Sequence, residues 1–377
     1  MNTKSAFVIL LLLLLPTATS PSAKTVNTGK VWTVDDDGPA DFQSIQEAVD
    51  AADSGDTVFV HNGVYVEHVS INKTISLVGE NSFNTIIDAD YSSPAAILIH
   101  AQDVTVRNLT AKNSQHAGHW GREDIRGGIY LDQSSGCIVE DCIVTGNEHG
   151  INLRGSKDNI VSHNLAERNN CGIRISYAST NSENNLVEGN WLVNNTRGMR
   201  VGEYAYNNTI TNNLFFNNYC SLIVWSPATG AVYHNNFVDD DALAIDASMG
   251  DFNISWSMDE RGNFYKNSTG ADVDGDGIGD TPYVIQYITW NPPYFIYENT
   301  SDDCPLMNPI NWLQGDINLD MKVNIVDIAL IAKAYGIHFG DAGWNPRCDL
   351  NSDNVIDILD IAVAAVDFDK QMTWQPT

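Results

Sequence analysis

Short aliphatic segments recur along the middle of the chain at a nearly constant spacing of about 22 to 26 residues. The tetrapeptides GIYL, GINL, GIRI, GMRV and SLIV begin at Gly128, Gly150, Gly172, Gly198 and Ser221. A second set of β-branched segments runs in step with them, and Asn and Gly separate the two sets. A period this short does not accommodate a propeller blade, but it fits one coil of a parallel β-helix.

Side chains alternate along a strand, which assigns each column of the repeat to the inside or the outside. In the pattern G-I-x-L the two aliphatic residues are expected to point inward, and x is expected to point outward into an exposed row. That row comprises Tyr130, Asn152, Arg174, Arg200 and Ile223. The residues two positions later are expected to share its face: Asp132, Arg154, Ser176, Gly202 and Trp225. A third column, Asn147, Asn169, Asn195 and Asn218, predicts a hydrogen-bonded ladder of turn asparagines.

The N-terminal part of the chain predicts a leader and a cap. Lys4 precedes an apolar run over 6–15, which is typical of a signal peptide, and we assign 1–23 to it, with an uncleaved anchor as the alternative. Less regular strands are expected between 56 and 111. Before them, Ile45, Ala48 and Val49 follow helical spacing within 41–52 and predict a short amphipathic helix that caps the open end of the stack.

The opening of the repeat region resembles a known family. The stretch from VDDDGPADFQSIQEAVDAADSGD to FNTIID, with DVDGDGIGDTPYVI (272–285) and DDCPLMNP (302–309), is similar to secreted β-helix proteins of the pectin-lyase-like superfamily. It is most similar to the NosD-type (periplasmic copper-binding) branch with its carbohydrate-binding and sugar-hydrolysis repeats. The resemblance implies an all-β, right-handed parallel β-helix, which we assign to 24–309. It implies no particular activity, because the fold hosts lyases, hydrolases and non-enzymes.

The residues after 310 predict calcium binding. DINLDMKVNIVD and DLNSDNVIDILD place oxygen-bearing side chains at loop positions 1, 3, 5, 9 and 12 and a backbone carbonyl at position 7 of a twelve-residue calcium loop. The predicted ligands are Asp316, Asn318, Asp320, Lys322, Asn324 and Asp327 in one loop, and Asp349, Asn351, Asp353, Val355, Asp357 and Asp360 in the other. Both loops end in Asp rather than Glu, and Met321 and Asn354 replace the usual Gly at position 6. Each loop runs into an apolar helical segment.

This duplicated loop and helix resembles a type I dockerin, over roughly residues 314–369. The resemblance implies a small α-helical module over 310–377 that docks onto a cohesin-bearing scaffold and uses Ca²⁺ as its cofactor. The alternative is a calcium-stabilised module that has no partner.

Two further stretches predict either a metal site or a plain polar loop. Asp272, Asp274, Asp276 and Asp280 alternate with glycines, a pattern that favours calcium but also suits a solvated acidic turn. His116 and His119 lie beside Trp120, where copper binding competes with an ordinary loop. Copper favours soft ligands, and the two histidines have no Met or Cys cluster beside them.

One disulfide is predicted among the six cysteines. Cys304 and Cys348 lie outside the coils and are the predicted pair. Cys171 and Cys220 share a column two rungs apart, roughly 9.6 Å along the stack, which exceeds the reach of a disulfide.

The charge pattern suggests an acidic ligand on the exposed face. The chain has 20 Lys and Arg against 48 Asp and Glu, a net charge of −28, which argues against nucleic-acid binding through a general positive field. Arginines nevertheless concentrate between 107 and 200. We expect a groove for an acidic polysaccharide lined by Trp120, Tyr130, Asn152, Arg154, Arg174, Arg200 and Trp225. The alternative is internal pairing of these arginines with Asp132, Glu148 or Glu123.

Three functions are compatible with these patterns. The first is a secreted or cell-surface enzyme on acidic polysaccharide, a lyase or glycoside hydrolase, with Glu123, Asp124 and Arg174 as candidate catalytic residues. For Glu123 and Asp124 a salt-bridged surface loop is the alternative. The second is a non-catalytic carbohydrate-binding or adhesion protein, and the third is copper delivery. None of the three requires a membrane span after the signal is cleaved.

Overall fold

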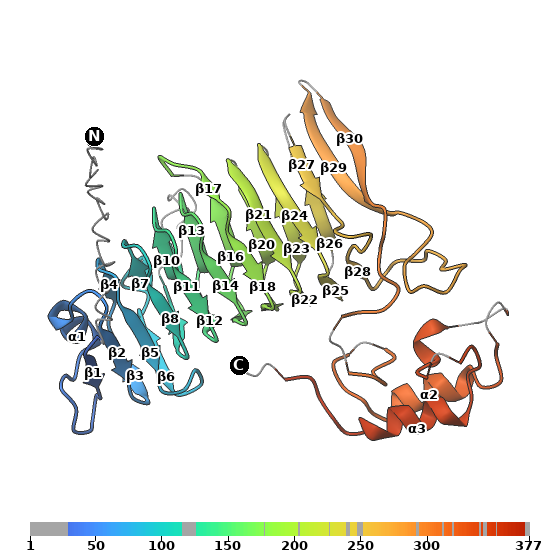
Figure 1. The fold of residues 1–377 in the computed structure, drawn as a ribbon, viewed down its shortest axis with the longest axis horizontal. Coiled ribbons are helices and arrows are strands. Elements are labelled where there is room, and N and C mark those ends of the chain that lie inside the picture. Colours follow the sequence, from blue (N-terminus) through green and yellow to red (C-terminus); the bar gives the residue numbers. More distant parts are fainter. Residues whose placement is uncertain are drawn as a thin grey trace, which may run out of the picture.

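Stacked parallel strands form most of the molecule (Figure 1). The computed structural model describes residues 29–114, 126–176, 178–202, 204–225, 227–238, 242–246, 252–291, 294–310, 313–318, 320–338, 341, 345–351 and 353–373. Three sheets run the length of this stack, and each strand pairs with the equivalent strand of the next coil. The predicted parallel β-helix is therefore confirmed.

A regular coil contributes one strand to each sheet, while β17 is an additional short strand of sheet A and β30 pairs antiparallel with β29. Sheet A contains β1 (Val31–Val34), β2 (Thr57–Val60), β5 (Ser76–Gly79), β8 (Thr105–Arg107), β11 (Ile138–Glu140), β14 (Ile160–Ser162), β17 (Ser182–Glu183), β18 (Leu186–Glu188), β21 (Ala205–Thr211), β24 (Ala228–Tyr233) and β27 (Phe252–Ser255). Sheet B contains β3 (Gly63–Tyr65), β6 (Thr85–Asp88), β9 (Thr110–Lys112), β12 (Ile143–Thr145), β15 (Leu165–Glu167), β19 (Trp191–Val193), β22 (Leu214–Phe216), β25 (Asn236–Val238) and β28 (Phe264–Tyr265). Sheet C contains β4 (Val69–Ile71), β7 (Ala95–Ile99), β10 (Gly127–Asp132), β13 (His149–Arg154), β16 (Cys171–Ser176), β20 (Arg197–Val201), β23 (Cys220–Val224), β26 (Ala242–Asp246), β29 (Tyr283–Asn291) and β30 (Tyr294–Asp302).

The register follows the sequence repeat. The first aliphatic position of the repeat forms one fully buried inner column: Ile129, Ile151, Ile173, Met199 and Leu222. Because a shift of one residue would turn every side chain to the other face, this column fixes the whole coil in place.

Asparagine ladders close the turns between the sheets. In the predicted ladder, Asn147 Nδ2 donates to Asn169 Oδ1, and the pattern continues through Asn195 to Asn218. Equivalent ladders join other asparagines: Asn159, Asn185 and Asn208 in one, and Asn164, Asn190, Asn213, Asn235 and Asn263 in another. Each member also donates to a backbone carbonyl, so the buried amides are satisfied.

Different elements lie at the two ends of the stack. At the N-terminal end α1 (Ile45–Ala51) buries Ile45, Ala48 and Val49, as predicted. Its N-terminus is held by Glu67, whose carboxylate accepts from the backbone N–H groups of Ile45 and Gln46. At the other end β29 and β30 form an antiparallel hairpin that projects beyond the coils (Figure 1), which the repeat pattern does not predict.

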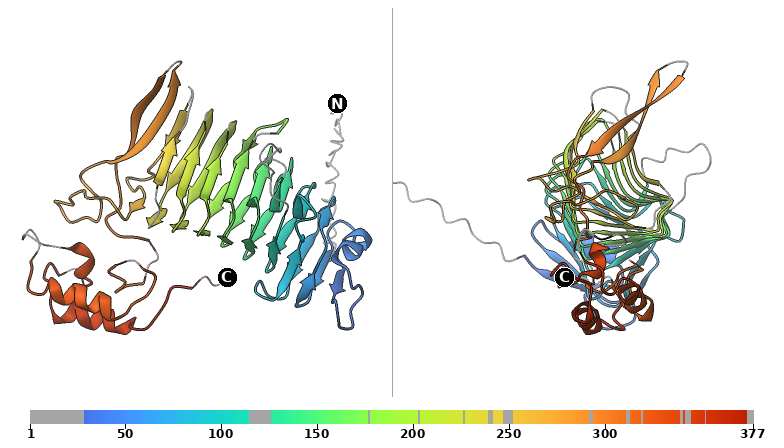
Figure 2. Two further views of the ribbon diagram at one scale, coloured as in Figure 1. Left: turned by 180° about the vertical axis from the view of Figure 1, so that it is seen from behind. Right: turned by 90° about the vertical axis from the view of Figure 1, so that its right-hand side faces the viewer.

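The C-terminal residues form a small helical module beside the last coils (Figure 2). It contains α2 (Ile325–Lys333), the 3₁₀-helix η2 (Pro346–Cys348) and α3 (Ile358–Val366). Its own buried core comprises Ile317, Ile331, Ala334, Cys348, Ile356 and Ala364. This core is separate from the long core of the β-helix.

Candidate functional site

The outward row of sheet C has the predicted register but not the predicted exposure. Tyr130, Asn152, Arg174 and Arg200 stand opposite one another on successive strands. However, Tyr130 is 5% exposed, Asn152 is 0% exposed and Arg174 is 8% exposed. The expectation of an open row is therefore wrong for these three residues. One cause is visible at Asn152, whose Nδ2 donates to the backbone carbonyl of Arg126, the residue directly before β10.

Arg174 is held by a histidine that the sequence pattern did not single out. Its Nη1 lies 2.9 Å from Nε2 of His149 on the neighbouring strand β13. Cys171 stands opposite His149, and burial raises the pKa of its thiol to about 11, although Arg174 lies nearby. The thiol is therefore protonated at neutral pH and the imidazole nitrogen faces a guanidinium, an arrangement that disfavours copper ligation.

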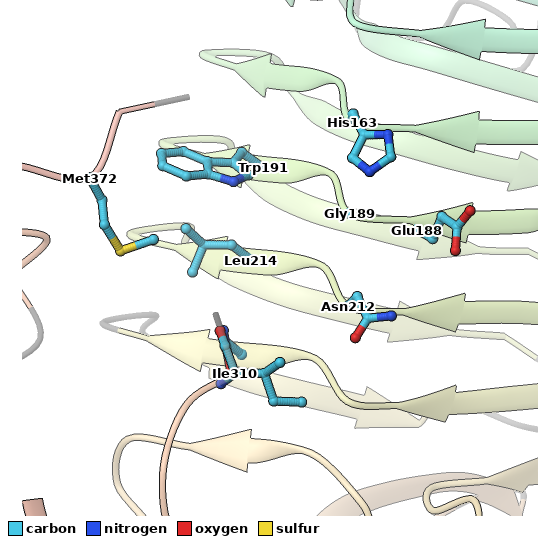
Figure 3. A pocket seen from close by; sticks show the side chains of 9 residues that line it. His163, Glu188, Gly189, Trp191, Asn212, Leu214, Ile310 and Met372 are labelled. Carbon is cyan, nitrogen blue, oxygen red and sulfur yellow. The ribbon is translucent and has the colours of Figure 1, made fainter. Parts of the chain in front are cut away.

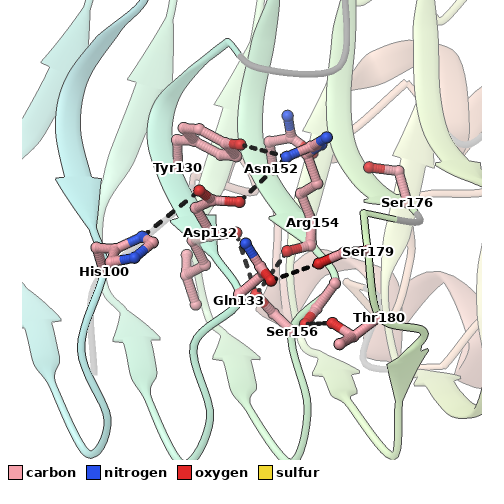
Figure 4. A network of polar contacts seen from close by, with 12 residues as sticks. His100, Tyr130, Asp132, Gln133, Asn152, Arg154, Ser156, Ser176, Ser179 and Thr180 are labelled. Atoms are coloured by element: carbon pink, nitrogen blue, oxygen red, sulfur yellow. Dashed lines mark hydrogen bonds and ion pairs between the residues drawn. The ribbon is translucent and has the colours of Figure 1, made fainter.

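Arg154 belongs to a polar network on the same face (Figure 4). Its Nη1 lies 3.2 Å from Oδ1 of Asp132 and donates to the Tyr130 hydroxyl at 3.5 Å. Asp132 also faces His100 at 3.5 Å. Burial raises the pKa of Tyr130, and the nearby Asp132 charge adds to the effect, so the hydroxyl stays protonated. Arg154 therefore pairs with Asp132 within the protein, which is the alternative to a role in a ligand groove.

The far end of the face is more accessible and has unmet hydrogen-bonding capacity. The Arg200 guanidinium lies over the Trp225 ring, 5.3 Å from its centroid, and both residues are partly exposed. Within the described residues, three buried atoms here have no hydrogen-bond partner: Arg200 Nε, Trp225 Nε1 and Ser176 Oγ. All three can donate, so the arrangement suits an oxygen-rich ligand.

The two predicted calcium loops have the same hydrogen-bond pattern. In the first loop Asp316 accepts from the backbone N–H groups of Asp320 and Met321. In the second loop Asp349 accepts from those of Asp353 and Asn354. The two loops thus adopt the same local structure although their sequences differ, which supports the prediction that they are repeats of one motif.

The last acidic residue of each loop is completely buried. Asp327 accepts from the backbone N–H groups of Ile317, Asn318 and Asn324. Asp360 makes the corresponding three bonds in the second loop, to Leu350, Asn351 and Asp357. Each therefore closes its loop and caps the helix that follows it.

The residue at position 6 of each loop adopts the backbone conformation for which calcium loops usually use glycine. Met321 has φ of 68° and Asn354 has φ of 69°, both in the left-handed region that usually requires glycine. The backbone thus turns as a calcium loop demands, at a strain cost of about 1 kcal/mol at each residue. The oxygen donors and this turn together fit a hard divalent cation such as Ca²⁺.

The acidic loop after β28 also gathers carboxylates. Ligand oxygens of Asp272, Asp274 and Asp276 all lie within 4.8 Å of one another, whereas Asp280 accepts from the backbone N–H of Val273. Gly275 and Gly277 have positive φ values and allow the chain to curl around this point. The structure brings three of the four predicted ligands together.

All six cysteines are free thiols in the structure, including the predicted pair Cys304 and Cys348. Cys348 is buried in the core of the C-terminal module, and Cys304 lies at the end of the β-helix, where its backbone N–H donates to Asp302. Cys171 and Cys220 are separated by Arg197, as their shared column predicts.

Several candidates lie outside the described residues, and the structure gives no account of them. These are the signal segment 1–23 and the side chains of His116, His119, Trp120, Glu123 and Asp124. In the described part of the chain, no helix is long and apolar enough to cross a membrane.

The chain is similar to known proteins over part of its length. A cell surface glycoprotein of Methanothermus fervidus is 25% identical over 359 residues, covering 69% of this chain and 56% of that protein. The chain thus spans little more than half the length of this curated relative. A solved structure described as the complex of XylC with xylose has a TM-score of 0.49 at 12% identity, over 72% of this chain and 74% of that one. Pectin methylesterase PemA from Erwinia chrysanthemi has a TM-score of 0.38 at 13% identity, over 62% and 92%.

The family described as periplasmic copper-binding protein (NosD) matches residues 49–270, which is more than half of the chain and most of the stacked coils. Together with the confirmed parallel β-helix, this match shows that the protein belongs to the NosD family.

Proposed function

We propose that the protein is an exported, surface-associated β-helix that attaches to a protein partner through its C-terminal module in a calcium-dependent manner. The observation that carries the proposal is the pair of loops with matching hydrogen-bond sets, each running into an amphipathic helix. The NosD family is described as periplasmic and the relative from Methanothermus fervidus is named as a cell surface protein, which fits export.

The partner surface is proposed at the start of the two helices. Ile325 and Val326 are 68% and 49% exposed, and the matching residues Ile358 and Leu359 are 59% and 53% exposed. Such apolar pairs at equivalent loop positions form a duplicated patch, and large exposed apolar side chains mark interaction sites. Because the module resembles type I dockerins, we propose a cohesin module as the partner.

Titration calorimetry of the full chain against a panel of type I cohesin modules tests this proposal. We expect binding in calcium and at least tenfold weaker binding in chelator. Ile325→Ser combined with Ile358→Ser should abolish binding, whereas Val66→Ser, which changes a residue 66% exposed on the β-helix, should not. Binding that is equal in chelator, or no binding to any cohesin in the panel, would overturn the docking role.

We also propose that acidic glycan binds at the Arg200–Trp225 end of sheet C. The support is the set of unpartnered donors there together with the stacked guanidinium and indole. Planar guanidinium groups bind carboxylates and sulfates, and an indole packs on a sugar ring. The proposed site comprises fewer residues than the predicted groove, because Tyr130, Asn152 and Arg174 are buried.

Affinity electrophoresis in polygalacturonate and in heparin tests the glycan site. Arg200→Ala and Trp225→Ala should each reduce retardation. Arg107→Ala, which removes a half-exposed arginine paired with Glu140 on another sheet, should not. Equal retardation of the parent and the three variants, or no retardation of the parent, would contradict the proposed glycan site. Copper delivery ranks below both proposals, because the converging ligand groups in the described residues consist only of carboxylates, which suit hard cations.

A further inference from the structure

A cavity of about 360 Å³ lies where the β-helix meets the C-terminal module (Figure 3). This volume falls within the range of small-molecule sites, about 300–1,000 Å³. Its lining comes from the turn between sheets A and B, from the outer face of sheet B and from the C-terminal chain: His163, Glu188, Gly189, Trp191, Asn212, Leu214, Asn236, Ile310 and Met372. None of these residues belongs to the calcium loops or to the sheet C face.

One side of the cavity is polar and is shaped by left-handed turn residues. His163, Gly189 and Asn212 occupy equivalent turn positions on successive coils, with φ values of 53°, 64° and 56°. A Cβ atom on Gly189 would lie 2.8 Å from Cδ2 of His163. The absence of a Cβ atom at Gly189 therefore leaves room for the His163 imidazole, which lines the cavity together with Glu188.

The other side is apolar and is built around an indole. Trp191 lies on β19 beside Leu214 of the next coil, and Met372 approaches from the C-terminal chain (Figure 3). Ile310 closes the end, held by two hydrogen bonds with the Asn236 side chain at 2.7 and 2.9 Å. Trp191 is only partly buried, so part of its ring surface lines the cavity.

We propose that this cavity binds a neutral pyranose sugar. An indole face packs on the C–H groups of a pyranose ring, while a carboxylate, an imidazole and an amide on the opposite side can hydrogen-bond its hydroxyls. The Glu188 carboxylate repels uronates and sulfated sugars, so the cavity selects against the acidic ligands proposed for Arg200 and Trp225. It is a second site of opposite charge preference on another face.

The cavity is connected to the first calcium loop. The Met372 N–H donates to the carbonyl of Met321, the position-6 residue of that loop, at 2.8 Å. Lys322 and Gln371 form an antiparallel bridge, and the Val323 N–H donates to the Lys370 carbonyl at 2.9 Å. Calcium in the loop therefore fixes the chain that carries Met372, and calcium removal loosens one wall without touching the sugar.

Saturation-transfer difference NMR on the full, calcium-loaded chain tests the proposal. The probes are the methyl pyranosides of glucose, galactose, mannose and xylose, with glucuronate and galacturonate as acidic counterparts. We expect saturable binding of at least one neutral glycoside and weaker binding of the uronates. Trp191→Ala should weaken binding about tenfold or more, Trp191→Phe should restore part of it, and Glu188→Gln should reduce the preference against uronates.

Tyr219→Ala is the matched control, because it removes an aromatic side chain that is 68% exposed outside the cavity. It should bind like the parent, and so should Ile325→Ser combined with Ile358→Ser, which separates this site from the docking surface. No saturable binding of any neutral glycoside would overturn the proposal. Binding that survives in Trp191→Ala with unchanged affinity would do the same.

Discussion

The β-helix and the C-terminal module are stabilised by opposite means. Each coil of the β-helix buries aliphatic columns against its neighbours, and ladders of asparagine amides satisfy the turns. The module has a core of six residues and crowds carboxylates into two loops. We therefore expect the first region to fold without a cation. The second region is small, so we expect it to need a cation to offset the repulsion between its carboxylates. Calcium should therefore control one region and leave the other unchanged.

The largest effect is expected from removing a buried loop carboxylate. Asp327→Ala leaves three backbone N–H groups without their acceptor, at about 1–3 kcal/mol each, and removes a predicted calcium ligand. This cost exceeds what the small core can supply, so the module should lose its helical circular dichroism while the β-sheet signal remains. Asp341→Ala, which changes an exposed carboxylate near His338 in the same module, is the control. Full helicity of Asp327→Ala in calcium would contradict the dependence on the loops.

A break in an asparagine ladder is expected to have the next largest effect, confined to the β-helix. Asn190 is fully buried, accepts from Asn164 and donates to Asn213. Asn190→Ala should reduce the free energy of unfolding of the β-helix by about 2–4 kcal/mol, because several buried polar groups lose their partners. Asn181→Ala, at a half-buried residue with a local bond to Glu183, should cost far less. Similar losses in both variants, measured by denaturant unfolding, would show that the ladder has no special role.

Asp302 provides a pH-dependent test at the end of the same ladder. Its buried carboxylate accepts from the Asn263 N–H and side chain and from the Tyr265 hydroxyl, and burial raises its pKa above 3.8 despite these bonds. The folded state therefore favours the protonated form. Its stabilising contribution is fully present below the unfolded pKa and is lost as the pH rises through the raised folded pKa.

Asp302→Asn keeps the amide ladder and removes this titration. The difference in unfolding free energy between the parent and Asp302→Asn should move against the parent as the pH rises from about 4 to 7. A difference that does not change over this range would contradict the buried, titrating carboxylate.

The smallest effect is expected at a strained turn. Asn354 is exposed and has φ of 69° at position 6 of the second calcium loop. Asn354→Gly should raise the stability of the module slightly, by about 0.5 kcal/mol, because relief of the backbone strain is partly offset by the larger conformational entropy that glycine loses on folding. A lower melting temperature would indicate that the side chain contributes more than its backbone strain costs.

Periodic columns predict much of the fold, because stacking copies one register from coil to coil. The inner column from Ile129 to Leu222, the ladder from Asn147 to Asn218 and the capping helix at Ile45 all follow from spacing. The burial of Arg174 does not, because it involves a contact with His149 that the alternation of inward and outward positions does not predict. The cavity beside Trp191 could not be predicted from the repeat either, because Met372, which lines it, lies far from Trp191 in the sequence.

Hydrogen exchange of the full chain, followed by mass spectrometry with calcium and with chelator, tests the contrast most directly. Local stability is read segment by segment in this measurement. We expect peptides from 313–373 to lose protection in chelator while those from the coils between 31 and 265 keep theirs. Equal protection of 313–373 in both conditions, or loss of protection throughout the coils, would contradict the account.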